Sequence, residues 1–84
     1  MVRMEAVFNC ADGMTPDVAA QLAQAAERYR SNLQMECGGK RVLLDSLIGI
    51  LSVACRRGTA LAVIADGEDE HDAAQAIAAL IEGK

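Results

Sequence analysis

The stretch TALAVIADGEDEHDAAQAI, which runs from Thr59 to Ile77, decides the fold because its residue pattern changes part-way along. Residues 59–65 are small or β-branched and apolar on both faces. This pattern predicts a central strand that is covered on one side and partly buried on the other. Residues 66–67, Asp-Gly, predict a turn, and apolar residues then recur at helical spacing. The expected buried stripe of that helix consists of Ala73, Ala74, Ile77, Ala78, Leu80 and Ile81.

Acidic residues occupy the start of this helix. Asp69 is expected to cap it, and Glu70 and Asp72 suit its first turn because the positive end of the helix dipole stabilises carboxylates. We interpret the run from residue 68 to residue 72 as a solvated helix start rather than a metal site. His71, the single histidine, is expected in the loop before the helix.

Three further strands are predicted upstream. Residues 2–8 alternate apolar and polar side chains, as do residues 33–37, and both segments therefore predict half-buried strands. Gly38 and Gly39 both tolerate a positive φ, so they predict a tight hairpin turn into a third strand over residues 40–44.

Two helix starts are visible in the same part of the chain. Thr15 is expected to cap the first helix with its hydroxyl, and Pro16 fits the first helical position, where its missing N–H costs nothing. This helix is expected to end near residues 29–30. Ser46 is the expected cap of a short helix over residues 47–52. The predicted buried stripe of the first helix is Val18, Leu22, Ala25, Ala26 and Tyr29.

The predicted order of elements is β-α-β-β-α-β-α. Three helices, one of them short, cannot cover both faces of four strands, so we expect a two-layer α+β sandwich with one sheet face more exposed. At 84 residues, the chain is expected to form one domain over residues 1–84. Taken without any family resemblance, the pattern also allows a ferredoxin-like α+β domain that binds a small ligand.

Composition narrows the classes of function. The net charge of −4 and the two aromatic residues argue against direct nucleic-acid binding. The sequence has neither a signal-peptide pattern nor a long apolar run, so we expect a cytoplasmic protein with no membrane segment. The three cysteines, Cys10, Cys37 and Cys55, form no metal or disulfide pattern, and no metal or cofactor is expected. The cysteines are expected to be buried or half-buried free thiols, and the alternative is that Cys10 is a reactive thiol at the end of the first strand.

The stretch DSLIGILSVACRRGTALAVIADGEDEHDAAQAI, residues 45–77, combines three motifs: a Ser-hydrophobic-hydrophobic-Gly helix, an Arg-Gly pair before a strand, and a Gly-x-Asp-Glu helix start. Together with the GGK hairpin, in register and without gaps, they resemble HPr, the phosphocarrier of the bacterial sugar phosphotransferase system. The resemblance implies an open-faced β-sandwich whose four antiparallel strands have the order 1-4-2-3 and whose one face carries three helices.

The family's first loop ends in a Gly-hydrophobic-His-x-Arg-Pro-Ala signature, in which the histidine carries the phosphoryl group and the arginine helps to hold the anion. In this sequence Thr15 stands at the histidine position and Asp17 at the arginine position, while Met14 keeps the hydrophobic one. Threonine lacks the imidazole nitrogen that forms a labile N–P bond. The resemblance therefore implies a chain without the phosphoryl acceptor, as in the Crh branch of the family, and no catalytic residue.

Ser46 stands where relatives from Gram-positive bacteria carry a regulatory serine. The resemblance implies that an HPr kinase/phosphorylase phosphorylates it and that the product binds a LacI-type transcription regulator. Leu47, Ile48 and Leu51 are expected to form an exposed docking patch beside Met14 and Thr15, with Ile50 pointing inward. From local sequence alone, Ser46 could be only a helix cap, and the three apolar residues could belong to the core.

These implications favour a regulatory binding protein of carbon catabolite control rather than an enzyme. It would act through protein partners as a monomer or weak homodimer, without contacting nucleic acid directly. Two alternatives remain open. One is a phosphocarrier with an atypical acceptor at Thr15, and the other is an HPr-like interaction module that is never phosphorylated.

Overall fold

The computed structural model of the protein describes residues 1–9, 15–52 and 56–83. The predicted order of elements is confirmed. The strands are β1 (Val2–Val7), β2 (Asn32–Cys37), β3 (Lys40–Leu43) and β4 (Ala60–Asp66). The helices are α1 (Pro16–Glu27), α2 (Leu47–Leu51) and α3 (Glu70–Ile81).

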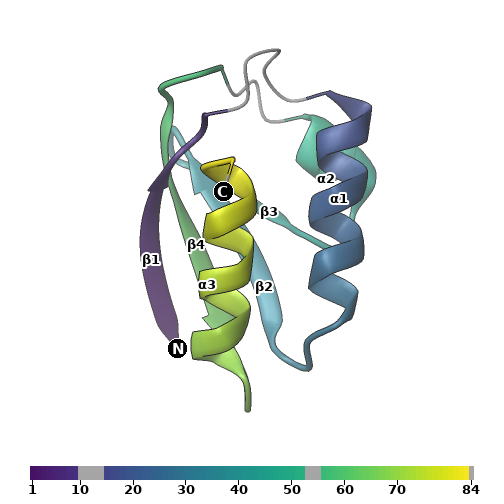
Figure 1. Ribbon diagram of the computed structural model, residues 1–84, viewed down its shortest axis with the longest axis vertical. Helices are drawn as coiled ribbons and strands as arrows, with labels where there is room; N and C mark the ends of the chain where they lie inside the picture. The colour runs from purple at the N-terminus through teal and green to yellow at the C-terminus, as the bar shows by residue number, and fades with distance from the viewer. Residues whose placement is uncertain (10–14, 53–55, 84) are drawn as a thin grey trace.

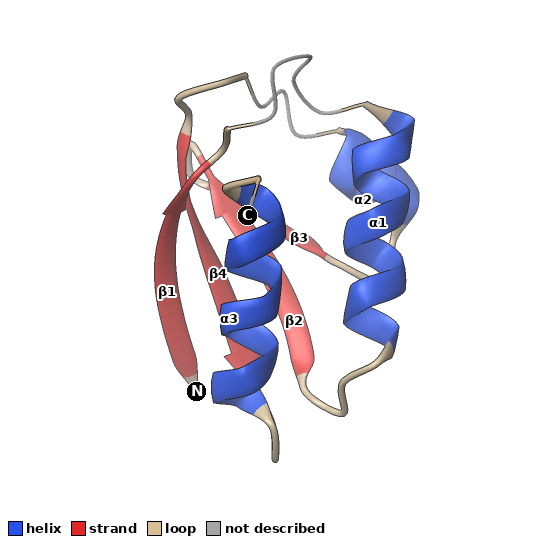
Figure 2. Cartoon of the chain, viewed as in Figure 1, coloured by secondary structure: helices blue, strands red, loops and turns tan. Residues whose placement is uncertain are grey.

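The four strands form one antiparallel sheet in the order β1-β4-β2-β3, as predicted. The helices lie on one side of this sheet, so the other face stays open (Figures 1 and 2). Helix α3 packs on β1, β4 and β2, whereas α1 packs against α3 and α2, and α2 packs against β3. Consequently, α1 and α2 lie together at the β3 side of the molecule (Figure 1).

The central strand β4 is buried on both faces. Leu61, Val63 and Ala65 belong to the core under the helices. Ala62 and Ile64 point to the open face but are only 3% and 4% exposed. Their neighbours across the strands include charged and polar side chains long enough to cover them: Arg3, Glu5, Gln34 and Glu36. The double-sided apolar pattern of residues 59–65 is thereby explained.

Helix α1 ends earlier than expected, at Glu27 rather than near residues 29–30. The cause is a contact with the loop before α3. The backbone N–H groups of Arg30 and Ser31 each donate to the Asp69 carboxylate at 3.0 Å, and the Ser31 hydroxyl donates to it at 2.5 Å. These N–H groups would serve the helix ladder if α1 continued.

The same contact corrects the prediction for Asp69. It does occupy the position before α3, but its side chain makes no capping hydrogen bond to that helix, because the carboxylate binds the α1–β2 loop. Two smaller predictions were also wrong. His71 lies inside the first turn of α3 rather than in the preceding loop. In α1 the fully buried residues are Leu22 and Ala19, the latter missing from the expected stripe, while Val18 is only half-buried.

Glycines in two of the loops explain how these loops close. Gly38 and Gly39 have φ values of 60° and 81°, so the predicted hairpin turn between β2 and β3 is confirmed. Gly67 is needed for space instead, since a Cβ atom there would lie 2.6 Å from the Cα atom of Ser31. The β4–α3 loop and the α1–β2 loop are thus in direct backbone contact.

Candidate functional site

Thr15 caps helix α1. Its Oγ1 accepts a hydrogen bond from the backbone N–H of Val18 at 3.3 Å, and its carbonyl accepts from that of Ala19 at 2.9 Å. The side chain is half-buried, whereas Asp17, in the first turn, is exposed. The hydroxyl is therefore already used in holding the helix start. Met14 and Cys10, which were predicted to lie nearby, are outside the described residues.

Ser46 caps the short helix α2. Its Oγ accepts from the Gly49 N–H at 3.1 Å, and its carbonyl accepts from the Ile50 N–H at 3.0 Å. The residue is exposed, so its hydroxyl faces solvent while it holds the first turn of the helix. Asp45, just before it, is exposed as well.

Three apolar side chains on α2 are exposed. Leu47, Ile48 and Leu51 have 44%, 83% and 39% of their surface accessible, and we refer to them as the α2 patch. Burial therefore decides against the possibility that they belong to the core. Ile50, by contrast, is fully buried, as the family resemblance implied. Apolar clusters that stay exposed beside a buried anchor are typical of protein docking sites.

Close packing against β3 fixes the orientation of α2. A Cβ atom on Gly49 would lie 3.2 Å from the Oγ atom of Ser46 and 3.7 Å from the Cβ atom of Val42. At the other end, the Ser52 hydroxyl donates to the Gly49 carbonyl at 2.6 Å, and the Lys40 ammonium donates to the Ser52 carbonyl at 3.5 Å. Local sequence gave no signal for this contact, because Lys40 lies at the start of β3 and not on the helix.

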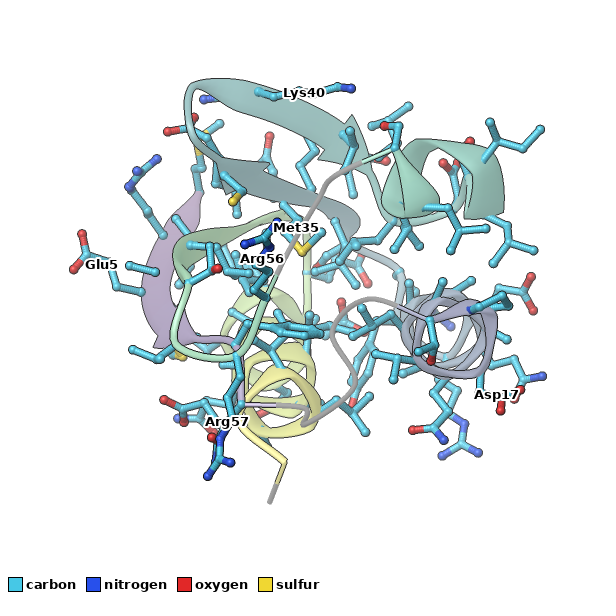
Figure 3. All side chains as sticks on the ribbon, turned by 90° about the horizontal axis from the view of Figure 1, so that it is seen from above. Glu5, Asp17, Met35, Lys40, Arg56 and Arg57 are labelled. Atoms are coloured by element: carbon cyan, nitrogen blue, oxygen red, sulfur yellow. The ribbon has the colours of Figure 1, made fainter. Side chains whose placement is uncertain are left out.

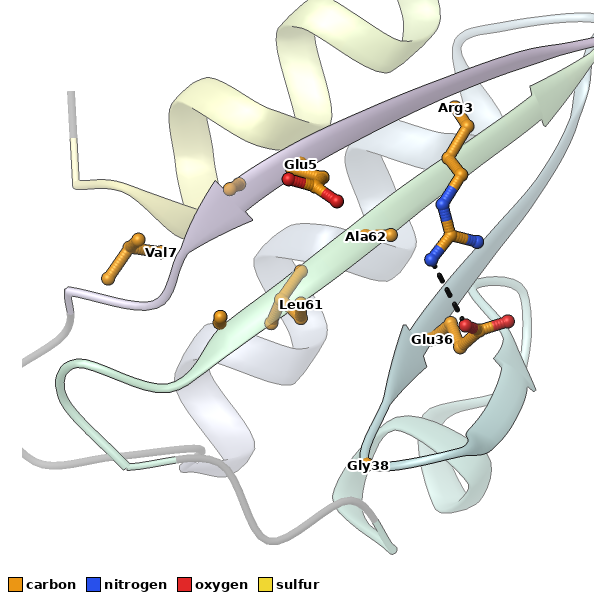
Figure 4. Close-up of a pocket in the computed structure, with 9 residues that line it drawn as sticks. Arg3, Glu5, Val7, Glu36, Gly38, Leu61 and Ala62 are labelled. Carbon is orange, nitrogen blue, oxygen red and sulfur yellow. Dashed lines mark hydrogen bonds and ion pairs between the residues drawn. The ribbon is translucent and has the colours of Figure 1, made fainter.

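An ion-pair network crosses the open face of the sheet and was not predicted. Arg3 and Arg41 donate to the two carboxylate oxygens of Glu36 at 3.1 Å and 3.0 Å. The hydrogen bond from Arg3, followed by that from Arg41, lowers the pKa of Glu36. Beside it lies a shallow hollow of about 320 Å³ that the small side chains of β4 leave open (Figure 4). Its lining includes the carboxylates of Glu5 and Glu36, and no Ser, Thr, Cys, Lys or His side chain is among its lining residues. The alternation of polar residues on β1 and β2 was the one signal that pointed to this face.

The acidic run before α3 has a structural role through Asp69. The Ser31 hydroxyl, and then the Arg30 N–H, lower the pKa of this carboxyl, so it stays ionised as a hydrogen-bond acceptor. Over residues 1–9, 15–52 and 56–83, no three His, Cys, Asp or Glu side chains are grouped to hold a metal ion. None of the helices in those ranges has the length and apolar character that crossing a lipid bilayer requires.

The two predicted sites lie on neighbouring helices. Since α1 packs against α2, the Thr15 and Ser46 caps belong to one helical layer, and the α2 patch lies on the same side of the molecule. His71 lies at the start of α3, at the end of the molecule opposite the start of α1 (Figure 1). It is therefore far from Thr15.

Comparison with known proteins identifies this arrangement. The family profile described as "PTS HPr component phosphorylation site" matches residues 2–83. The chain belongs to the HPr family. It is 34% identical to the HPr-like protein Crh of Bacillus subtilis (strain 168) over 82 residues, which cover 98% of this chain and 96% of Crh. It is also 32% identical to the phosphocarrier protein HPr of Xylella fastidiosa (strain 9a5c), over all of this chain and 94% of that protein.

Solved structures agree with this assignment of fold. The crystal structure of a phosphocarrier protein HPr from Bacillus anthracis str. Ames superposes with a TM-score of 0.90 at 29% identity, covering 95% of each chain. A crystal structure of Crh from Bacillus subtilis, described as a dimer with domain swapping, gives a TM-score of 0.81 at 33% identity and covers 100% of this chain and 90% of that one. The HPr-like sandwich implied by the sequence is thus confirmed.

Proposed function

We propose that this chain is a regulatory HPr-like protein that does not transfer phosphoryl groups through histidine and acts by binding other proteins in carbon catabolite control. The observation that carries the proposal is the role of Thr15. At the position of the family's histidine stands a hydroxyl that accepts the Val18 N–H and holds the start of α1. This residue serves the fold, and a threonine ester would be too stable to pass its phosphoryl group on.

Asp17 supports the same conclusion. The family's arginine at this position helps to hold the phosphoryl anion, whereas an exposed carboxylate repels it. The loss of both the acceptor and the anion-binding cation means that a degenerate member, similar to Crh, fits the residues better than a phosphocarrier does. Such a protein is a substrate and binding partner of other proteins and not itself an enzyme, and we place it in the cytoplasm.

Ser46 is the proposed site of regulation. An HPr kinase/phosphorylase would form a bond between Ser46 Oγ and the γ-phosphorus of ATP, with ADP as the leaving group and the hydroxyl proton passing to a base of the kinase. The serine is exposed, as such a reaction requires. The phosphoserine would add a charge of about −1.5 to −2 beside the α2 patch. This charge would direct binding to a LacI-type regulator.

A second candidate is an interaction module that is never phosphorylated. Asp45 favours it, because a carboxylate next to Ser46 opposes an added phosphate. In this case Leu47, Ile48 and Leu51 would bind partners in one constant state.

Phosphorylation assays separate these functions. The protein is incubated with ATP and a bacterial HPr kinase, and in parallel with phosphoenolpyruvate and the general phosphotransferase enzyme, and mass spectrometry locates the phosphate. We expect phosphate on Ser46 from the kinase alone. Ser46→Ala should abolish it, whereas Ser52→Ala, a matched change at the other exposed serine of α2, should leave it intact.

Other outcomes assign other functions. Phosphate from phosphoenolpyruvate on Thr15, lost in Thr15→Ala, would establish a phosphocarrier with an atypical acceptor and contradict the proposal. Phosphate from neither donor would leave the unmodified interaction module. Sedimentation of the untreated protein tests the remaining prediction, that it is a monomer or a weak homodimer.

A further inference from the structure

The α2 patch has opposite charges at its two ends. Asp45 lies directly before Ser46, the N-cap of α2, and the Lys40 ammonium lies at the last turn, 3.5 Å from the Ser52 carbonyl. Between them, Leu47, Ile48 and Leu51 are exposed. The charges therefore mark the two ends of one apolar surface.

The negative end is available to a partner. Asp45 is exposed, and within the described part of the chain its carboxylate takes part in no ion pair or hydrogen bond. By contrast, the arginines of the open face are both engaged with Glu36. An unpaired surface carboxylate costs nothing in the free protein and attracts a cation on a docking protein.

The positive end is held in place by the hairpin. The Gly38-Gly39 turn directs Lys40 back along β3, and its side chain extends toward the side of the molecule on which α2 lies (Figure 3). Ser52 closes the helix, and a cation near the last carbonyls of a helix is favourable. The contact leaves the ammonium exposed, so further hydrogen bonds to a carboxylate remain possible.

The separation of the two charges decides how a partner senses them. The five residues of α2 span about 7.5 Å at the helical rise of 1.5 Å per residue, and the extended Ser46 adds about 3.3 Å, so Asp45 and Ser52 lie about 10 Å apart along the chain. The Debye length at physiological ionic strength is about 8 Å. A partner therefore interacts with each charge separately. The two opposite charges thus favour one orientation of a bound partner over the other.

We infer that the α2 patch binds a protein segment with an apolar face that places a Lys or Arg against Asp45 and an Asp or Glu against Lys40. The inference rests on the proposed function in using α2 as the docking helix, but it does not depend on modification of Ser46. A second copy of the chain is a poorer occupant. Three apolar side chains offer far less than the roughly 1,200 Å² that stable interfaces bury.

Designed helical peptides test this inference. Each carries the same Leu/Ile face, flanked by Lys at one end and Glu at the other, by Glu at both ends, or by Lys at both ends. Binding to the unphosphorylated protein is followed by NMR through the amide shifts of residues 46–52. We expect the Lys/Glu peptide to bind tightest, by about two- to five-fold per matched end, which corresponds to exposed ion pairs. The preference should vanish in high salt.

Charge reversal supplies the matched control. Asp45→Lys should shift the binding preference to the peptide with Glu at both ends. When Asp45→Lys is combined with Lys40→Glu, the Lys/Glu peptide should again bind tightest, but in the opposite orientation. A spin label at the Lys end of the peptide reports this direction, since it should broaden residues 45–47 in the native protein and residues 51–52 in the double variant.

Several results overturn the inference. One is equal affinity for all three peptides. Another is a spin label that broadens the signals at both ends of α2 equally. A third is a change in the NMR shifts of the α2 patch that depends on protein concentration alone, which would show that a second copy of the chain binds there. The kinase assay is independent of these outcomes. If Ser46 is not phosphorylated but the peptides show the directional preference, only the proposed regulation is contradicted. If Ser46 is phosphorylated but the peptides show no preference, only this inference is contradicted.

Discussion

Replacement of Gly67 by alanine tests whether the contact between the α1–β2 and β4–α3 loops holds this fold together. The added Cβ atom would lie 2.6 Å from Ser31 Cα, 2.8 Å from Ser31 Oγ and 3.1 Å from Ser31 Cβ. Gly67 is not among the described glycines with positive φ, so the backbone conformation itself would accept alanine. The effect would therefore report space alone.

The magnitude follows from the contact distances. Carbon atoms pack at about 3.5–4.0 Å, so the Ser31 backbone would have to move by about 1 Å. That movement would also disturb the hydrogen bonds that Arg30 and Ser31 donate to Asp69. Overpacking of this kind costs about 1–3 kcal/mol. For a domain of this size, each kcal/mol lowers Tm by about 4–8 °C.

Thermal and urea unfolding, followed by circular dichroism at pH 7, measure this loss. The matched control is Gly49→Ala, where the nearest atom is the side-chain Oγ of Ser46 at 3.2 Å. Alanine is favoured over glycine inside a helix by about 0.8–1.0 kcal/mol, and this gain offsets the tight contact with Ser46, so the control should be close to neutral. Surface substitutions usually change the free energy of unfolding by no more than about 0.5 kcal/mol. If Gly67→Ala also stays within this range, the contact between the two loops does not hold the fold together.

Three further predictions concern stability. In the folded protein the pKa of Asp69 is lowered below its ordinary value of 3.8, so its contribution to the free energy of unfolding is complete above pH 3.8 and is lost as the pH falls through the folded pKa. Asp69→Asn should therefore weaken the loss of stability at acid pH in a plot of stability against pH. An unchanged acid dependence would contradict the role of Asp69 in the loop contact. Thr15→Ala should cost about 0.5–2 kcal/mol through loss of the helix cap, and Thr15→Ser much less, as urea titrations would show. Ile50→Ala should lower the free energy of unfolding by about 2–5 kcal/mol, because Ile50 is fully buried. Ile48→Ala, on the exposed face of the same helix, should change it by no more than about 0.5 kcal/mol. Equal losses of stability would mean that the α2 patch is not exposed to solvent.

Much of the fold could be predicted because the signals are local. Alternation along β1 and β2, the glycine pair in the hairpin, and the caps at Thr15 and Ser46 all depend on residues within a few positions of one another. The residues of the candidate site were named from the family motifs. Thr15 and Ser46 cap α1 and α2, Met14 lies outside the described residues, and the roles of all these residues in binding and modification remain predictions.

The predictions that were wrong involve distant residues. Asp69 was expected to cap α3, and α1 was expected to continue to residues 29–30; both errors have one cause, the hydrogen bonds between residues 30–31 and Asp69. Helical periodicity likewise did not single out Ala19, which is fully buried, whereas Val18, which was expected in the buried stripe, packs against the core while only partly buried. These contacts exist only once the two loops and the helices meet in space.

By itself, the sequence determined the order of elements, the half-buried alternation of the strands and the two helix caps, and it led to the proposal that Thr15 stands in place of the family's histidine. The tertiary structure alone decided that Leu47, Ile48 and Leu51 face solvent while Ile50 is buried, and that Lys40 reaches the end of α2. The physical reason is that a hydrogen-bond cap or a strand pattern is satisfied within a few residues. Exposure and charge placement depend on which elements pack together, and no local pattern records that.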